Sequence, residues 1–121
     1  MTDLELPAYD ATVIAELLGA TGNDAAFIRE LVGTYLAEGD VLLARMAAAA
    51  EAGDSAAMVP AAHTLKSSSA ALGATRLAAI CRGIEEAGRA GRTEEFAREA
   101  QGARDAWAET VAALRSAGWA Q

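Results

Sequence analysis

The chain has 121 residues, a formal net charge of −7 and one cysteine, Cys81. This length suits one hydrophobic core, so we expect residues 1–121 to form a single domain. Scattered positive residues argue against a nucleic-acid or membrane partner, and the absence of a signal peptide or membrane span predicts a cytoplasmic protein. A composition with few aromatics and 2 prolines, without β-branched runs, favours an all-α class.

Two helices are expected in the first half of the chain. The first is capped by Asp10 and ends near Ala20, and the second opens at Asn23 or Asp24 and ends at Gly53. The apolar residues of the second helix recur at spacings typical of a bundle seam: Ile28, Val32, Tyr35, Leu42, Met46 and Ala49.

Two glycines, Gly33 and Gly39, fall inside this second helix. Each weakens a helix by about 1 kcal/mol relative to alanine. We therefore expect the close approach of a neighbouring helix to compensate, or a bend at this place.

The third expected helix carries the most informative residues. It is capped by Asp54 or Ser55 and runs to Leu72, with Gly73 suited to the left-handed residue that ends it. Pro60 lies inside this helix, where the missing N–H and the ring predict a kink or a loosened first turn.

Two more helices complete the predicted bundle. The fourth begins at Thr75 and is broken by GRAGR at residues 88–92, and the last begins at Thr93. Their apolar stripes are Leu77, Cys81, Ile84 and Gly88 in one, and Phe96, Ala100, Ala103, Trp107, Val111 and Leu114 in the other. Short loops predict an all-α, up-and-down antiparallel four-helix bundle with a short additional N-terminal helix.

His63, the only histidine, lies in the third helix. On a helical wheel of about 100° per residue with Met58 at zero, the core positions fall within roughly 40° of zero: Met58, Ala62, Leu65, Ser69 and Leu72. His63 falls near roughly 140°, so we expect it to face outward. Lys66 stands one turn away, where its ammonium either contacts phosphoryl oxygens or is simply solvated.

The residues around His63 narrow the roles that a histidine can have. A metal site needs more ligands at short spacing, and a hydrolytic triad needs a nucleophile elbow that Ser67, Ser68 and Ser69 do not provide. No glycine-rich phosphate loop is present. Two roles are left for His63. Its imidazole attacks an electrophile that another protein delivers, or it is a buried structural histidine.

The segment AHTLKSSSAALGA at residues 62–74 combines alanine-histidine, two residues, lysine, small residues and a leucine-glycine turn. This pattern resembles the histidine-containing phosphotransfer (HPt) domains of bacterial multistep phosphorelays. The likeness extends through LLARMAAAAEAGD upstream and RLAAICRGIEEAGRAG downstream, over at least residues 31–91. The family often has glycine directly after the lysine, whereas Ser67 stands here and is still small enough to leave a path to the ring.

The resemblance implies that His63 accepts a phosphoryl group, through its Nε2 atom, and that Lys66 helps to hold that group. The chain would take the group from a receiver-domain aspartate or a hybrid kinase and pass it reversibly to the aspartate of a response regulator. It would be a monomeric phosphocarrier without autonomous turnover, with receiver domains and a sensor or hybrid histidine kinase as partners. No cofactor is expected on this chain, and Mg²⁺ is expected on the receiver. Docking is expected to use Val59, Ser67 and Ala70.

Other readings of an outward histidine stay open. A non-catalytic adaptor with the same fold is possible, although the presence of both His63 and Lys66 argues against it. The dimerisation hairpin of a histidine kinase would need a following ATP-binding domain and a dimer partner, so the mass in solution distinguishes it. A purely structural bundle is the third alternative. Trp119 either packs under the bundle or contacts a partner.

Overall fold

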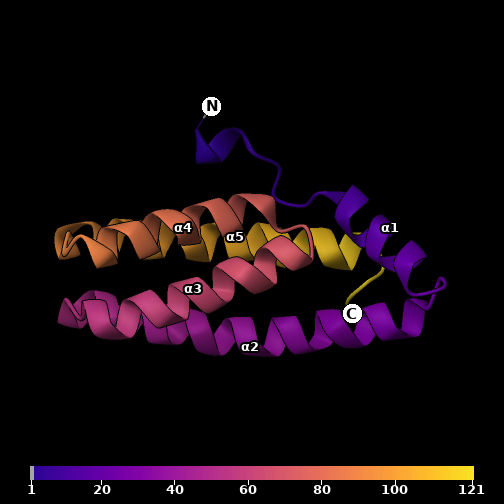
Figure 1. Ribbon diagram of the computed structural model, residues 1–121, viewed down its shortest axis with the longest axis horizontal. Coiled ribbons are helices and arrows are strands. Elements are labelled where there is room, and N and C mark those ends of the chain that lie inside the picture. Colours follow the sequence, from indigo (N-terminus) through magenta and orange to yellow (C-terminus); the bar gives the residue numbers. More distant parts are fainter. Residues whose placement is uncertain (1) are drawn as a thin grey trace.

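Four long helices form an up-and-down antiparallel bundle, with a shorter helix at the N-terminal end (Figure 1). The structure is a computed structural model that describes residues 2–121. Its α-helices are α1 (Ala11–Ala20), α2 (Ala25–Ala52), α3 (Ser55–Ala71), α4 (Thr75–Arg89) and α5 (Phe96–Ser116). Two 3₁₀ turns, η1 (Asp3–Glu5) and η2 (Thr93–Glu95), precede α1 and α5. No strand occurs in residues 2–121, so the predicted fold class is confirmed.

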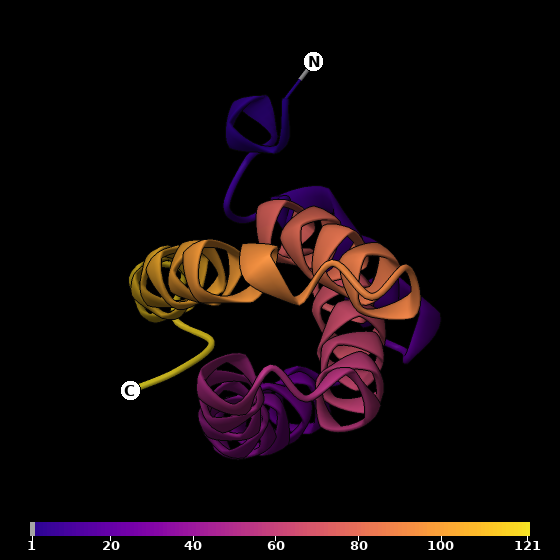
Figure 2. The same cartoon turned by 90° about the vertical axis from the view of Figure 1, so that its left-hand side faces the viewer.

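The four long helices occupy the corners of the bundle when it is viewed along its length (Figure 2). Helix α3 packs against α4 and α2, and α5 packs against the same two helices from the other side. Helices α3 and α5 are therefore diagonal to each other, and one face of α3 points out of the bundle. Within the described part of the chain, no helix combines the length and the apolar character needed to cross a bilayer.

Aspartate side chains begin the first three α-helices. Each accepts a hydrogen bond from a backbone N–H in the first turn: Asp10 from Thr12 at 3.0 Å, Asp24 from Phe27 at 3.0 Å and Asp54 from Ala57 at 3.1 Å. These bonds satisfy N–H groups that have no partner inside the helix. They also decide the two alternatives left by the sequence, because Asp24 and Asp54 are the caps.

The start of the last helix differs from the prediction. Residues 93–95 form the 3₁₀ turn η2, and α5 itself starts at Phe96. Neither Arg92 nor Glu95 caps its helix with a side chain, and the backbone N–H of Glu95 instead bonds to the carbonyl of Arg92 at 3.2 Å. Such a tighter turn is common at the ends of α-helices. Pro60 lies inside α3, and the residues on both sides of it are helical.

The predicted core face of α3 is buried at all five positions, including the polar Ser69. The Ser69 hydroxyl is satisfied by a 2.7 Å hydrogen bond with the hydroxyl of Tyr35 on α2. Burial raises the pKa of Tyr35, so its hydroxyl stays protonated and can take part in this bond. Cys81 is also fully buried, and burial raises the pKa of its thiol to about 12, as suits a small apolar core residue.

At Gly39 the missing side chain lets the indole of Trp107 on α5 pack directly against the backbone of α2. A Cβ atom at this position would lie 2.0 Å from the Cη2 atom of Trp107. The indole packs edge-on against Tyr35 with 5.1 Å between ring centroids, and its N–H donates to Asp40 at 3.2 Å. Close packing of Trp107 therefore compensates for the helix stability lost at Gly39, as predicted. At Gly33 close packing does not compensate, because no atom of a neighbouring element lies within 4 Å of a Cβ added there.

Trp119 lies in the segment that follows α5 and turns back over α2. Its ring packs against the hydrophobic core and is half-buried, and the guanidinium of Arg29 lies 5.6 Å from the ring centroid. Of the two alternatives for Trp119, the structure shows packing on the bundle.

Candidate functional site

His63 lies on the outward face of α3, and its side chain is 55% exposed. The predicted outward orientation is confirmed, and a buried structural histidine is excluded. The same helix turns the five core positions inward, so the geometry of one helix fixes both the core and the exposed ring. The imidazole is therefore accessible to a second macromolecule.

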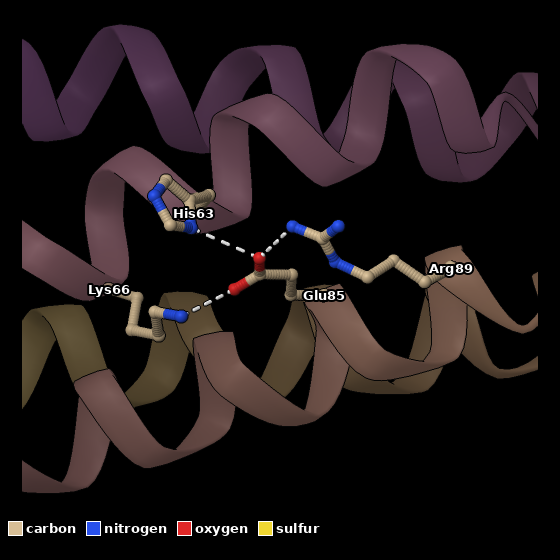
Figure 3. A network of polar contacts seen from close by, with 4 residues as sticks. All are labelled: His63, Lys66, Glu85 and Arg89. Carbon is tan, nitrogen blue, oxygen red and sulfur yellow. Dashed lines mark hydrogen bonds and ion pairs between the residues drawn. The ribbon is translucent and has the colours of Figure 1, made fainter.

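The carboxylate of Glu85 on α4 contacts the imidazole of His63 at its Nδ1 atom (Figure 3). Its Oε2 atom lies 3.0 Å from Nδ1 of His63, and its Oε1 atom accepts a 2.6 Å hydrogen bond from Nζ of Lys66. The guanidinium of Arg89, one helical turn further along α4, also donates to Oε2. Glu85 is only 5% exposed, so three donors surround one nearly buried carboxylate.

These donors determine the charge of Glu85. Hydrogen bonds from Lys66 and then Arg89 lower the pKa of the carboxyl to about 2, against the opposing effect of burial. At neutral pH the group is therefore an ionised carboxylate. A carboxylate can accept hydrogen bonds but cannot donate one.

The charge of Glu85 fixes the tautomer of His63. Because the carboxylate is only an acceptor, the neutral ring must carry its proton on Nδ1 to make this bond. The lone pair then resides on Nε2, and Figure 3 shows this second nitrogen directed away from Glu85. In the neutral ring, this arrangement directs the nitrogen that carries the lone pair outward.

The sequence prediction missed two members of this network, Glu85 and Arg89, and Glu85 is the one that contacts the ring. A signal was present, because Glu85 falls four residues after Cys81 and three before Gly88, on the apolar stripe of α4. A carboxylate at a buried position requires donors to be stable there. Helical spacing alone does not tell which residues of another helix supply them.

The other predicted site residues lie around the ring in different environments. Lys66 is 29% exposed and is held by Glu85, while Ser67 and Ala70 are exposed on the same side of α3. Val59 is half-buried, and a Cβ at Gly88 of α4 would lie 2.6 Å from its Cγ2 atom. Val59 thus packs against α4, whereas Ser67 and Ala70 are open to solvent.

The chemistry available here is that of one nucleophile and two nearby cations. Among residues 2–121, no group of three or more histidine, cysteine or acidic side chains is arranged to hold a metal ion. Lys66 and Arg89 both donate to the carboxylate that contacts His63, so two cations stand beside the side chain that orients the ring.

Comparison with known proteins gives a consistent result. The model of the Hpt domain family matches residues 30–117. The crystal structure of histidine-containing phosphotransfer protein B (HptB) from Pseudomonas aeruginosa PAO1 superposes with a TM-score of 0.81 at 25% sequence identity. That match covers 91% of this chain and 94% of the other. A search of curated proteins finds no significant match.

Proposed function

The chain belongs to the Hpt domain family, and on that premise we propose that His63 is the residue that carries the phosphoryl group. Members of this family are phosphocarriers, and the chain is a histidine phosphotransfer intermediate of a two-component phosphorelay. One observation carries the assignment to His63: ionised Glu85 holds its Nδ1–H at 3.0 Å and leaves Nε2 free and exposed.

The proposed step is an in-line transfer between two proteins. The Nε2 lone pair attacks the phosphorus of a receiver-domain aspartyl phosphate, and a nitrogen–phosphorus bond forms. The bond between phosphorus and the aspartate oxygen breaks, and the carboxylate leaves with the electron pair. The Nδ1 proton stays in its hydrogen bond to Glu85, so no proton needs to move. The reverse attack by a response-regulator carboxylate returns the ring to its neutral form.

Lys66 is proposed to stabilise the phosphoryl group. Its ammonium is one helical turn from His63 and is already positioned by Glu85 at 2.6 Å. A positioned cation stabilises charge on the equatorial phosphoryl oxygens without further reorganisation. Glu85 in turn is a positioning residue, because it contacts the ring and not the phosphorus.

We propose that the chain acts as a single-domain monomer, because His63, Lys66, Glu85 and Arg89 all come from one copy. Its partners in this family role are receiver domains and histidine kinases. We place it in the cytoplasm, where response regulators act, and propose that it has no turnover without a receiver. We expect Mg²⁺ on the receiver's carboxylates and no cofactor on this chain.

Phosphotransfer tests the proposal. A panel of receiver domains is phosphorylated with radiolabelled acetyl phosphate, freed of donor and mixed with the parent chain or its His63→Gln variant. We expect acid-labile, base-stable label on the parent only, the stability pattern of phosphohistidine. Label on the variant, or a correctly folded parent that no receiver labels, would contradict it; the second result would favour the adaptor.

A further inference from the structure

The groove between α3 and α4 has a charge opposite to that of the whole chain. One stripe of α4, with spacings of four, three and four residues, faces this groove: Ala78, Arg82, Glu85 and Arg89. Across it on α3 lie His63, Lys66, Ser67 and Ala70. The groove thus gathers three cations and one carboxylate, in a protein whose net charge is −7.

Arg82 is the cation of this groove that the proposed chemistry does not use. Lys66 and Arg89 are both bound to Glu85. The side chain of Arg82 is exposed and has no hydrogen bond or ion pair with any other residue in the range 2–121 that the structure describes. Its charge is therefore available to a partner at no cost in internal contacts.

Beside Arg82 the surface is hollowed. A cavity of about 480 Å³ opens next to the phosphoacceptor and is lined by Leu6, Lys66, Ser67, Ala70, Thr75, Ala78, Ala79 and Arg82. We call it the Lys66–Arg82 pocket. Small side chains form most of its wall, and cations stand at two places on it. The two cations give this hollow a charge that is complementary to a carboxylate.

The N-terminal wall of this pocket is fixed to α4. The guanidinium of Arg76 donates from Nε to the carbonyl of Leu6 at 2.9 Å, and the backbone N–H of Arg76 donates to the carbonyl of Pro7 at 3.1 Å. These bonds hold Leu6 against the side of the groove. The pocket is thus built from three segments of the chain.

We propose that the Lys66–Arg82 pocket receives an acidic loop of the receiver domain during phosphotransfer, with Arg82 contacting a carboxylate of that loop. The inference rests on the proposed function of His63, because it places the partner's phosphorylated aspartate over that ring. An interface of about 800 Å² per partner reaches roughly 16 Å from its centre, so one centred on His63 covers the adjoining pocket.

Charge complementarity selects this occupant. We expect carboxylates that hold Mg²⁺ around the phosphorylated aspartate of the receiver, and the negative charge of most of this chain repels such groups. The cationic groove therefore offers such a partner both a favourable approach and one orientation. On the other side of α3, a cavity of about 480 Å³ is lined by residues that include Val41, which is 50% exposed, and Thr64. An apolar partner surface would instead bind beside Val41, on the α2 side of α3.

Initial rates of transfer test the pocket. A receiver domain that phosphorylates the parent is assayed with Arg82→Gln at low and high ionic strength. Arg104→Gln is the matched control, because Arg104 is exposed on α5, which lies diagonal to α3, and its removal changes net charge equally. We expect Arg82→Gln to lower kcat/KM about two- to fivefold at low ionic strength, through KM, and the difference to fade at high ionic strength. Arg104→Gln should match the parent.

The results separate a failure of the pocket proposal from a failure of the function proposed for His63. Parental kinetics for Arg82→Gln, with His63→Gln inactive, would overturn the pocket and leave the proposed function intact. A loss in Val41→Ser together with parental Arg82→Gln would place the partner on the α2 side and overturn it as well. Normal labelling of His63→Gln would overturn both proposals. Amide shifts at Ser67, Ala70 and Ala78 on titration with the unphosphorylated receiver provide a readout independent of transfer, and their absence would count against the pocket.

Discussion

Glu85 and His63 stand on different helices, 22 residues apart in sequence, and are joined by a 3.0 Å contact between Oε2 and Nδ1. In the proposed function, this contact orients an exposed histidine as the nucleophile. The carboxylate stays ionised because Lys66 and Arg89 donate to it, so these two cations influence the ring through Glu85. The four side chains therefore act as a unit, and changes to them should not be additive.

Replacing Glu85 should slow phosphotransfer. In Glu85→Ala the ring loses the acceptor that holds its proton on Nδ1, and we expect the transfer rate to fall about 10- to 100-fold. Glu85→Gln should fall less, because its amide oxygen can still accept from Nδ1–H. The check is the transfer rate together with ¹⁵N chemical shifts of the imidazole, which report the tautomer.

Glu86→Gln is the control for that experiment, because Glu86 is the exposed neighbouring carboxylate on the same helix. It should match the parent in both measurements. A Glu85→Ala chain with the parental rate and tautomer would show that Glu85 does not position the ring.

Acid should remove the stability that Glu85 contributes. Its pKa in the folded chain is about 2, below the ordinary value of 4.5, so the folded state binds fewer protons than the unfolded state between these values. The stabilisation is therefore complete above about pH 4.5 and is lost as pH falls towards 2. At neutral pH we expect Glu85→Gln to be less stable by about 1–3 kcal/mol.

Urea unfolding of the parent and Glu85→Gln across this pH range measures the effect. The difference in the free energy of unfolding should shrink as pH falls from 4.5 to 2. Other carboxylates titrate in both proteins, so comparing the two isolates Glu85. A difference independent of pH would contradict the assigned ion cluster.

Lys66 should matter for the rate more than for the fold. We expect Lys66→Gln to slow transfer about tenfold, less than the loss of a fully buried donor, because the Lys66 side chain is 29% exposed. Lys66→Arg should retain more activity, since it keeps the charge. Single-turnover transfer measures the rate, and imidazole ¹⁵N shifts tell whether the ring has moved. A parental rate for Lys66→Gln would remove Lys66 from the proposed site.

The two glycines of α2 should respond to alanine in opposite directions. Gly39→Ala should destabilise the chain by about 1–3 kcal/mol, because its Cβ would overlap the indole of Trp107. Gly33→Ala should stabilise it by about 0.5–1 kcal/mol, because the position is helical and open. Denaturant unfolding followed by tryptophan fluorescence checks both values. Equal effects would mean that helix propensity alone governs these positions.

Local signals in the sequence were sufficient for most of the fold. Aspartate caps, left-handed glycines such as Gly53 at φ 63° and Gly73 at φ 83°, and apolar spacing each depend on neighbours within a few residues. The same spacing turned His63 outward and Ser69 inward, as observed. The inward and outward faces could be predicted because every α-helix repeats about every 3.6 residues, whatever its neighbours are.

Contacts between helices could not be predicted in the same way. The pairing of Glu85 with His63 and the packing of Trp107 on Gly39 depend on the rotation and offset of whole helices. The burial of Val59 was not predicted for the same reason. The helical wheel does not show that Gly88 lets α4 approach closely enough to half-bury this side chain. The start of α5 at Phe96, after the 3₁₀ turn η2, was also not predicted.

The most direct test of the central claim is to locate the phosphoryl group. After transfer from a receiver, NMR of the ¹⁵N-labelled chain detects coupling between phosphorus and one imidazole nitrogen. We predict phosphorus bound to Nε2 of His63, with the proton retained on Nδ1. Phosphorus on Nδ1, or on any residue other than His63, would contradict the role assigned to the contact between Glu85 and His63.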